Sequence, residues 1–162
     1  MDSSEFKQFM SRVPTCVSVV ASFHKGKVQA CTISSFISVD VEVPMSLITL
    51  KNGSKTLDAI INSKYYSVSF LSRDQVDVAK TFSDKLSIPP TKLHSLFSKD
   101  NRFLSPHLQD CLQICFCKLE RVIKLENSSL LFGSAVGLTL KSNNNPLVYS
   151  SRVYNELSPL PE

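Results

Sequence analysis

The sequence predicts a mainly β domain of the α+β class, an antiparallel barrel with a few short flanking helices. Runs typical of strands outnumber runs typical of helices, and most connections between them are short enough to be hairpins. No G-x-G-x-x-G pattern follows a strand, which disfavours a Rossmann-type fold. The length of 162 residues fits one domain over residues 1–162, large enough to bury an ordinary core.

Periodicity supports each element in the first half of the chain. Phe6, Phe9 and Met10 repeat at helical spacing until Pro14, which cannot continue a helix. Valine-rich and continuous apolar runs follow, and Gly26 marks a turn between the first two. We therefore expect a helix at 4–12, strands at 15–23 and 28–34 around a turn at 25–27, a central strand at 45–50 and a helix at 54–62.

The second half continues mainly as strands. One further helix is indicated by Val76 and Ala79 at helical spacing. Residues 83–110 contain several prolines and no sustained periodicity, so we expect a loop or a short helical excursion there. The expected elements are strands at 65–71, 111–125, 129–140 and 147–149, a helix at 73–82, and turns at 126–128 and 142–146.

The charged residues exclude some classes of partner. Eighteen basic and fourteen acidic residues give a formal net charge of +4 and form no basic stripe, so nucleic acid is not expected as a partner. Mild basicity suits an anionic small molecule. No apolar run approaches the roughly 20 residues of a membrane span, and the N-terminus lacks the pattern of a signal peptide. We expect a cytoplasmic protein with no membrane contact.

Five cysteines, an odd number without a C-x-x-C pair, do not indicate a disulfide framework. Cys115 and Cys117 alternate in a strand-like run, so both side chains should face the same side as small buried hydrophobes. No histidine stands at ligand-like spacing from them, and no metal site is expected. Cys31 lies beside a hydroxyl-rich segment, where core packing is favoured over a redox role.

Two hydroxyl-rich segments flank the expected central strand. The first runs from Thr32 to Ser38 at the end of a strand, and the second, Asn52-Gly53-Ser54-Lys55-Thr56, begins a helix. A helix start offers free N–H groups and a partial positive charge, and therefore favours an anion. Hydroxyls and a lysine beside it predict a phosphate site. Hydroxyls on two segments favour a phosphorylated cofactor with a sugar chain over inorganic phosphate.

A structural reading of the same residues is open. Serine and threonine are common at strand ends and helix caps for local reasons. Ser54 in particular fits an N-cap before Leu57, Ile60 and Ile61. Either segment alone favours this structural role.

The order of several short segments resembles the flavin reductase-like family, over roughly residues 6–157. No single segment is decisive, but together, in order and at family-like spacing, they are specific. They are residues 13–20 (VPTCVSVV), 30–39 (ACTISSFISV), 44–47 (PMSL), 54–56 (SKT), 78–83 (VAKTFS), 131–133 (LFG) and 146–149 (PLVY).

The resemblance implies a Greek-key FMN-binding split β-barrel with FMN in a groove at a homodimer interface. It also implies contacts for individual residues. Thr32, Ser34 and Ser35 would contact the ribityl chain and the ring edge, and Ser54, Lys55 and Thr56 would hold the phosphate. Lys80 would assist them from the second helix, with Phe82 and Ser83 near the cofactor; for Phe82 a core role is equally open, and for Lys80 a solvated surface is the favoured alternative.

The resemblance implies hydride transfer from NADH or NADPH to FMN, with reduced flavin passed to a partner monooxygenase or another acceptor. FAD is also compatible, because its adenylate half can extend into solvent. Such chemistry needs little from side chains beyond a fixed ring plane, N–H donors and an open face for the nicotinamide. The absence of an acid–base dyad is therefore no argument against an enzyme.

One turn departs from the family pattern. Many members carry Gly-Asp-His before the Leu-Phe-Gly-like strand, and here the turn is Glu126-Asn127-Ser128. Ser128 is then a weak candidate at the nicotinamide face. His94 and His107 lie in the irregular segment and could reach over the site, but a surface position is favoured for each.

Three functions stay open from the sequence. The first is an NAD(P)H-dependent FMN reductase. The second is an FMN-binding electron-transfer or redox-sensing protein without efficient NAD(P)H turnover, which the missing histidine favours. The third is a barrel that has lost its cofactor, and the retained Ser54-Lys55-Thr56 segment argues against it.

Overall fold

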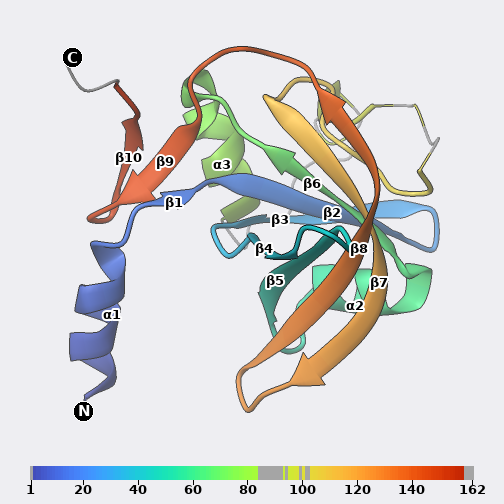
Figure 1. Ribbon diagram of the computed structural model, residues 1–162, viewed down its shortest axis with the longest axis horizontal. Helices are drawn as coiled ribbons and strands as arrows, with labels where there is room; N and C mark the ends of the chain where they lie inside the picture. Colours follow the sequence, from blue (N-terminus) through green and yellow to red (C-terminus); the bar gives the residue numbers. More distant parts are fainter. Residues whose placement is uncertain (1, 84–92, 94, 99, 101–102, 159–162) are drawn as a thin grey trace.

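Two antiparallel sheets form the protein in the computed structural model, which describes residues 2–83, 93, 95–98, 100 and 103–158 (Figure 1). The larger sheet has the strand order β3-β2-β6-β7-β8-β5-β4, and the smaller has the order β1-β9-β10. The elements are α1 (Ser3–Ser11), β1 (Thr15–Cys16), β2 (Ser18–His24), β3 (Lys27–Ile33), β4 (Ile37–Asp40), β5 (Met45–Lys51), α2 (Lys55–Ser63), β6 (Tyr65–Phe70), a 3-10 turn (Arg73–Gln75), α3 (Val76–Ser83), β7 (Gln113–Lys124), β8 (Ser128–Leu140), β9 (Leu147–Ser150) and β10 (Val153–Glu156).

The large sheet is buried on both faces near its centre. Val19 and Ala21 of β2 belong to one apolar cluster, which includes Phe82 of α3, whereas Val20 belongs to a second cluster with Ile60 of α2. Because α2 and α3 cover different faces of the sheet, β2 is apolar at successive positions instead of alternating. The two helices that flank the sheet are therefore fixed by separate cores.

The predicted mainly antiparallel β architecture with a few helices is confirmed. The single strand expected at 15–23 is wrong, because it is interrupted at Val17. The Val17 N–H donates to Leu147 O, and its carbonyl accepts from Leu71 N, each at 3.0 Å. The chain passes there from the small sheet to the large one. The helix expected at 73–82 begins with a 3-10 turn.

Two strands were not predicted, and both lie at sheet edges. β4 is exposed at every position, and β10 is exposed at three of its four. An edge strand with little burial has no alternating apolar pattern to mark it. The irregular segment expected at 83–110 lies partly outside the described residues, and within its described part Phe97 and Leu108 form an isolated bridge.

The two shortest hairpins use the same kind of turn. Lys25 and Gly26 connect β2 to β3, and both have positive φ. Ser151 and Arg152 connect β9 to β10 with φ of 53° and 64°, although neither is a glycine. Such primed turns match the twist of the strands but strain residues that carry a side chain. The β9–β10 turn is thus held in a conformation that its own residues do not favour.

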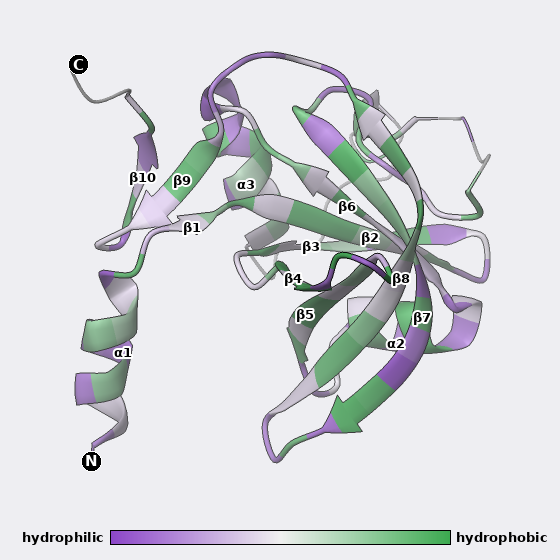
Figure 2. Cartoon of the chain, in the orientation of Figure 1, coloured by the Kyte–Doolittle hydropathy of each residue, from purple (hydrophilic) through white to green (hydrophobic). Residues whose placement is uncertain are grey.

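Helix α1 stands apart from the barrel and lies beside the β9–β10 turn (Figure 1). None of its residues is buried. Figure 2 shows both hydrophobic and hydrophilic bands along it. Ser4 and Gln8 of the helix and its C-cap residue Arg12 line a cavity with the hairpin turn, whereas Phe9 is 69% exposed. The helix therefore turns its apolar stripe outward, the reverse of an ordinary surface helix.

No helix in the described ranges is long and apolar enough to cross a membrane.

Candidate functional site

The end of β3 lines an open cavity of about 310 Å³. Three residues of the predicted site, Thr32, Ser34 and Ser83, meet there, although Ser83 is distant from the other two in sequence. The full lining is Val17, Thr32, Ile33, Ser34, Ser83, Tyr149 and Tyr154.

The cavity's hydroxyls are oriented by one shared acceptor. Thr32 Oγ1 donates to Ala79 O at 2.6 Å, and Ser83 Oγ donates to the same oxygen at 2.8 Å. Each hydroxyl has then used its only proton and keeps its oxygen lone pairs. Both can accept hydrogen bonds from the hydroxyls or N–H groups of a ligand in the cavity.

Aromatic rings form another wall of the cavity. Tyr149 and Tyr154 pair across the β9–β10 hairpin, with ring centroids 5.1 Å apart and an interplanar angle of 60°. These residues were not predicted as site residues from the sequence. A recognisable signal was the two tyrosines placed symmetrically about a short turn. Their rings offer an apolar surface for part of a planar ligand.

Ser35 has a structural role through its side chain. Its hydroxyl accepts from Thr49 N at 3.0 Å and donates to Thr49 O at 3.2 Å. These bonds fasten the segment after β3 to β5. Ser35 does not line the cavity, so a side-chain contact with a ligand there is disfavoured.

The second hydroxyl-rich segment forms the start of α2. Ser54 is the N-cap, and its hydroxyl accepts from Leu57 N at 3.2 Å. The cap leaves the N–H groups of Lys55 and Thr56 without a backbone acceptor in the described part of the chain. The Lys55 side chain is exposed beside them. Two free donors, a helix dipole and an ammonium group fit a phosphate.

Strand β3 joins the cavity to the α2 N-terminus. Cys31 packs against the apolar cluster that contains Leu57 and Ile60 of α2, while the hydroxyl of the next residue, Thr32, donates to α3. Consecutive residues therefore connect the two predicted segments. Burial raises the pKa of the Cys31 thiol and outweighs the opposite effect of the Thr56 hydroxyl. A neutral thiol supports the packing role over a redox role.

Two other candidate residues of α3 do not line the cavity. Phe82 is buried in the core and packs edge-to-face on Phe97, with ring centroids 5.7 Å apart. Lys80 is exposed on the same helix. For Phe82 the core role is the one that the geometry supports.

Ser128 lies at the tip of the β7–β8 hairpin, opposite Lys51 of β5. It is not part of the cavity lining. The tip is tied instead to the loop before α2, because Asn52 N donates to Asn127 O and Asn52 Nδ2 donates to Leu125 O. Asn52 thus positions the helix start, a role that the sequence did not reveal.

His107 does not line the cavity. His107 is 7% exposed and stands edge-on to Phe116 at 5.0 Å, so its expected surface position is wrong. His94 lies outside the described residues.

Among the described residues no three His, Cys, Asp or Glu side chains gather in a way that could hold a metal ion. Cys115 and Cys117 do face the same side, with their sulfur atoms 3.5 Å apart.

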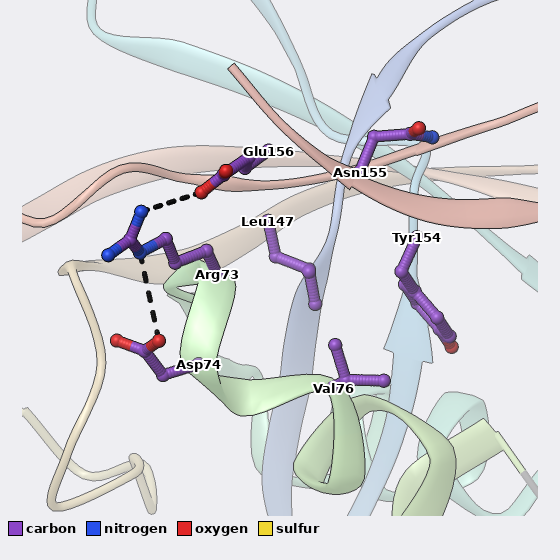
Figure 3. Close-up of a pocket in the computed structure, with 7 residues that line it drawn as sticks. All are labelled: Arg73, Asp74, Val76, Leu147, Tyr154, Asn155 and Glu156. Atoms are coloured by element: carbon purple, nitrogen blue, oxygen red, sulfur yellow. Dashed lines mark hydrogen bonds and ion pairs between the residues drawn. The ribbon is translucent and has the colours of Figure 1, made fainter. Parts of the chain in front are cut away.

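A neighbouring pocket of about 430 Å³ lies beside the same hairpin (Figure 3). Arg73 is engaged there with Glu156 at 2.6 Å and with Asp74 at 3.7 Å. The hydrogen bond and charge of Glu156 raise the pKa of Arg73. Because two carboxylates already balance the positive charge of Arg73, this pocket is a poor anion site. Tyr154 lines both this pocket and the cavity.

The whole site lies inside a region that matches a known family model. Residues 10–158 match the model of the flavin reductase like domain, which is most of the chain. The chain belongs to this family. The matched region includes the barrel and both hydroxyl-rich segments, residues 32–38 and 52–56.

Curated relatives of this flavin reductase-like chain include the reductase component of a monooxygenase and a flavin reductase. The chain is 26% identical over 150 residues to the reductase component of 4-nitrophenol 4-monooxygenase/4-nitrocatechol 2-monooxygenase of Rhodococcus opacus, covering 92% of this chain and 78% of the relative. It is 24% identical to the NADH-dependent flavin reductase StyB of Pseudomonas fluorescens, covering 99% and 93%. A flavin reductase domain protein from Arthrobacter sp. FB24 has the same fold, with a TM-score of 0.90, 20% identity and 99% coverage of both chains.

The cap at Ser54 gives a test of its structural role. Replacing Ser54 by alanine should lower the free energy of unfolding by about 1 kcal/mol without flavin, because Leu57 N loses its acceptor. Ser54→Asp retains a capping oxygen and should keep that stability, while its negative charge should weaken phosphate binding. Thermal unfolding of both variants measures the effect. Equal stability of Ser54→Ala and the wild type would contradict the assignment.

Proposed function

We propose that this protein is an NAD(P)H-dependent flavin reductase, which transfers hydride from NADH or NADPH to FMN. The observation that carries the proposal is the position of Cys31 and Thr32 on β3, where Cys31 packs against α2, whose N-terminus suits a phosphate, and Thr32 lines the hydroxyl-bearing cavity. An elongated ligand with a polar chain and a terminal phosphate fits this pair of features. Membership of the flavin reductase-like family supports the same reaction.

Each part of the site has a separate task. The α2 N-terminus and Lys55 bind the phosphate, and the hydroxyls of Thr32 and Ser83 accept hydrogen bonds from the ligand. Tyr149 and Tyr154 exclude water from one wall. Bound FMN supplies the hydride-accepting chemistry. The protein contributes mainly a fixed ring plane and position, so a side-chain acid–base pair is not required.

The product is reduced flavin for a partner oxygenase. The relatives named above include a monooxygenase reductase component, which supports such a partner for this chain. FAD is a second candidate flavin, because the phosphate-binding helix start is at the surface and leaves room for an adenylate group outside.

A second candidate function is flavin-based electron transfer or redox sensing without efficient NAD(P)H turnover. The observation that favours it is the position of Ser128. It stands where the family resemblance expects a histidine, and it lies beside the loop before α2, outside the cavity lining. The side of the flavin that would receive the nicotinamide then lacks that imidazole.

Anaerobic mixing of the purified protein with FMN and excess NADH, and separately NADPH, tests the proposed function. We expect rapid bleaching of the visible flavin band relative to a protein-free control, and the faster donor identifies the preference. Flavin that binds but stays oxidised with both donors would overturn the reductase function and favour electron transfer.

We also propose that the protein is a homodimer in which α1 packs against a second copy. Its outward stripe of Phe6, Phe9 and Met10 is exposed, and a helix of nine residues is marginal without tertiary packing. Burial of Phe9 should therefore be a large part of the contact.

Sedimentation velocity of Phe9→Glu tests this arrangement. We expect a monomer where the wild type sediments as a dimer, because a carboxylate would be buried in an apolar contact. Lys7→Glu, on the same helix and off the stripe, serves as the control and should remain dimeric. A dimeric Phe9→Glu protein would place the interface elsewhere.

A further inference from the structure

A separate polar cavity of about 560 Å³ lies between α1 and the β9–β10 turn. Every lining side chain carries a hydrogen-bond donor, and two of them are guanidinium groups. The lining is Ser4, Gln8, Ser11, Arg12, Ser151 and Arg152. None of these residues lines the cavity at the end of β3, which is called the flavin cavity from here on.

Two hydrogen bonds to main-chain carbonyls hold the two sides of this cavity together. Ser151 N donates to Ser11 O at 2.5 Å, and Ser150 Oγ donates to Arg12 O at 3.3 Å. Positions 4, 8, 11 and 12 share one face of a helix, so these contacts direct all four toward the turn. The arrangement is thus set by one main-chain bond and one serine hydroxyl, and neither bond uses an arginine side chain.

The charges in the cavity are unbalanced. Neither Arg12 nor Arg152 has an ion-pair partner among the described residues, in contrast to Arg73 with Glu156. The carboxylate of Asp2 lies near the rim, where it accepts a hydrogen bond from Ser4. Two like charges lining one cavity repel, and an oxyanion between them removes that repulsion. Arginine also matches phosphate oxygens geometrically.

The hairpin connects this cavity to the flavin cavity. Arg152 is two residues from Tyr154, which lines the flavin cavity, and a strand rises by about 3.3 Å per residue, so roughly 7 Å separates them along the backbone. A dinucleotide is longer than this separation. One ligand can therefore place its nicotinamide at the flavin and a phosphate between the arginines.

We propose that Arg12 and Arg152 bind a phosphate group of the dinucleotide hydride donor, an inference that rests on the proposed function. The arginines are binding residues for the donor and do not contact the flavin. Loss of either guanidinium removes one charge-assisted contact, so we expect about a tenfold loss of donor affinity in each variant.

Calorimetric titration of the FMN-loaded protein with NAD⁺ and NADP⁺ tests the proposal, using Arg12→Gln and Arg152→Gln. Arg121→Gln, an exposed arginine of β7, is the matched control and should bind like the wild type. Inorganic phosphate should compete with the dinucleotide in the wild type. A larger loss for NADP⁺ identifies the 2′-phosphate as the group held, and equal losses identify the pyrophosphate.

Failure of the arginine site and failure of the reductase function give different results. If both variants bind the dinucleotides as tightly as Arg121→Gln, while the wild type reduces FMN, the arginine site is overturned and the reductase function stands. If the wild type neither binds a dinucleotide nor reduces FMN, the proposed function fails and the donor site fails with it.

Discussion

Replacing Gly133 by alanine should lower the free energy of unfolding by about 3 kcal/mol, the largest effect expected from a single methyl group in this protein. A Cβ at this position of β8 would lie 2.1 Å from Tyr66 Oη and 2.9 Å from Tyr66 Cζ. Tyr66 is fully buried and cannot move aside without displacing its neighbours. Chemical denaturation of the wild type and the variant measures the loss.

A double-mutant cycle isolates the cause of that loss. Tyr66→Phe removes the atom nearest to the new methyl group, so Gly133→Ala should cost less in that background. Gly53→Ala is a contrasting control, because its Cβ meets nothing within 4 Å but its φ is +72°. Strain alone should then cost about 1 kcal/mol. Equal costs for Gly133→Ala in both backgrounds would contradict the proposed clash.

Replacing Lys55 by alanine should weaken FMN binding by about 10- to 100-fold, with little change in stability. The ammonium group is exposed beside the free N–H groups of α2, and a charge-assisted contact to phosphate typically contributes about 1.5–3 kcal/mol. Quenching of flavin fluorescence on titration measures the affinity. Riboflavin, which lacks the phosphate, should bind the wild type and the variant equally.

A second lysine variant is the control for the loss of a positive charge in Lys55→Ala. Lys27→Ala removes an exposed lysine at the opposite end of β3 and should leave FMN affinity unchanged. Thr56→Ala is a poor test, because Thr56 is buried and its replacement also disturbs packing. If Lys55→Ala binds FMN like the wild type, the phosphate is held elsewhere, and Lys80 becomes the residue to replace.

Local pattern was enough for most elements and for both hydroxyl-rich segments. The pattern of apolar residues shows which positions are buried in the strands at 45–50 and 65–71 and in the helix at 54–62. Ser54 is recognisable as the cap of that helix. The edge strands β4 and β10 are not marked in this way, because exposed strands take their structure from pairing with a neighbour.

The sequence by itself determined the antiparallel class, the order of the main strands and the presence of a helix start suited to an anion. Only the tertiary structure decided which residues share a cavity. Ser83, Tyr149 and Tyr154 reach Thr32 through pairings between distant segments, while Phe82 and Ser35 turn to other partners. Periodicity reports which face of an element is buried, whereas the neighbour on that face is set by long-range packing.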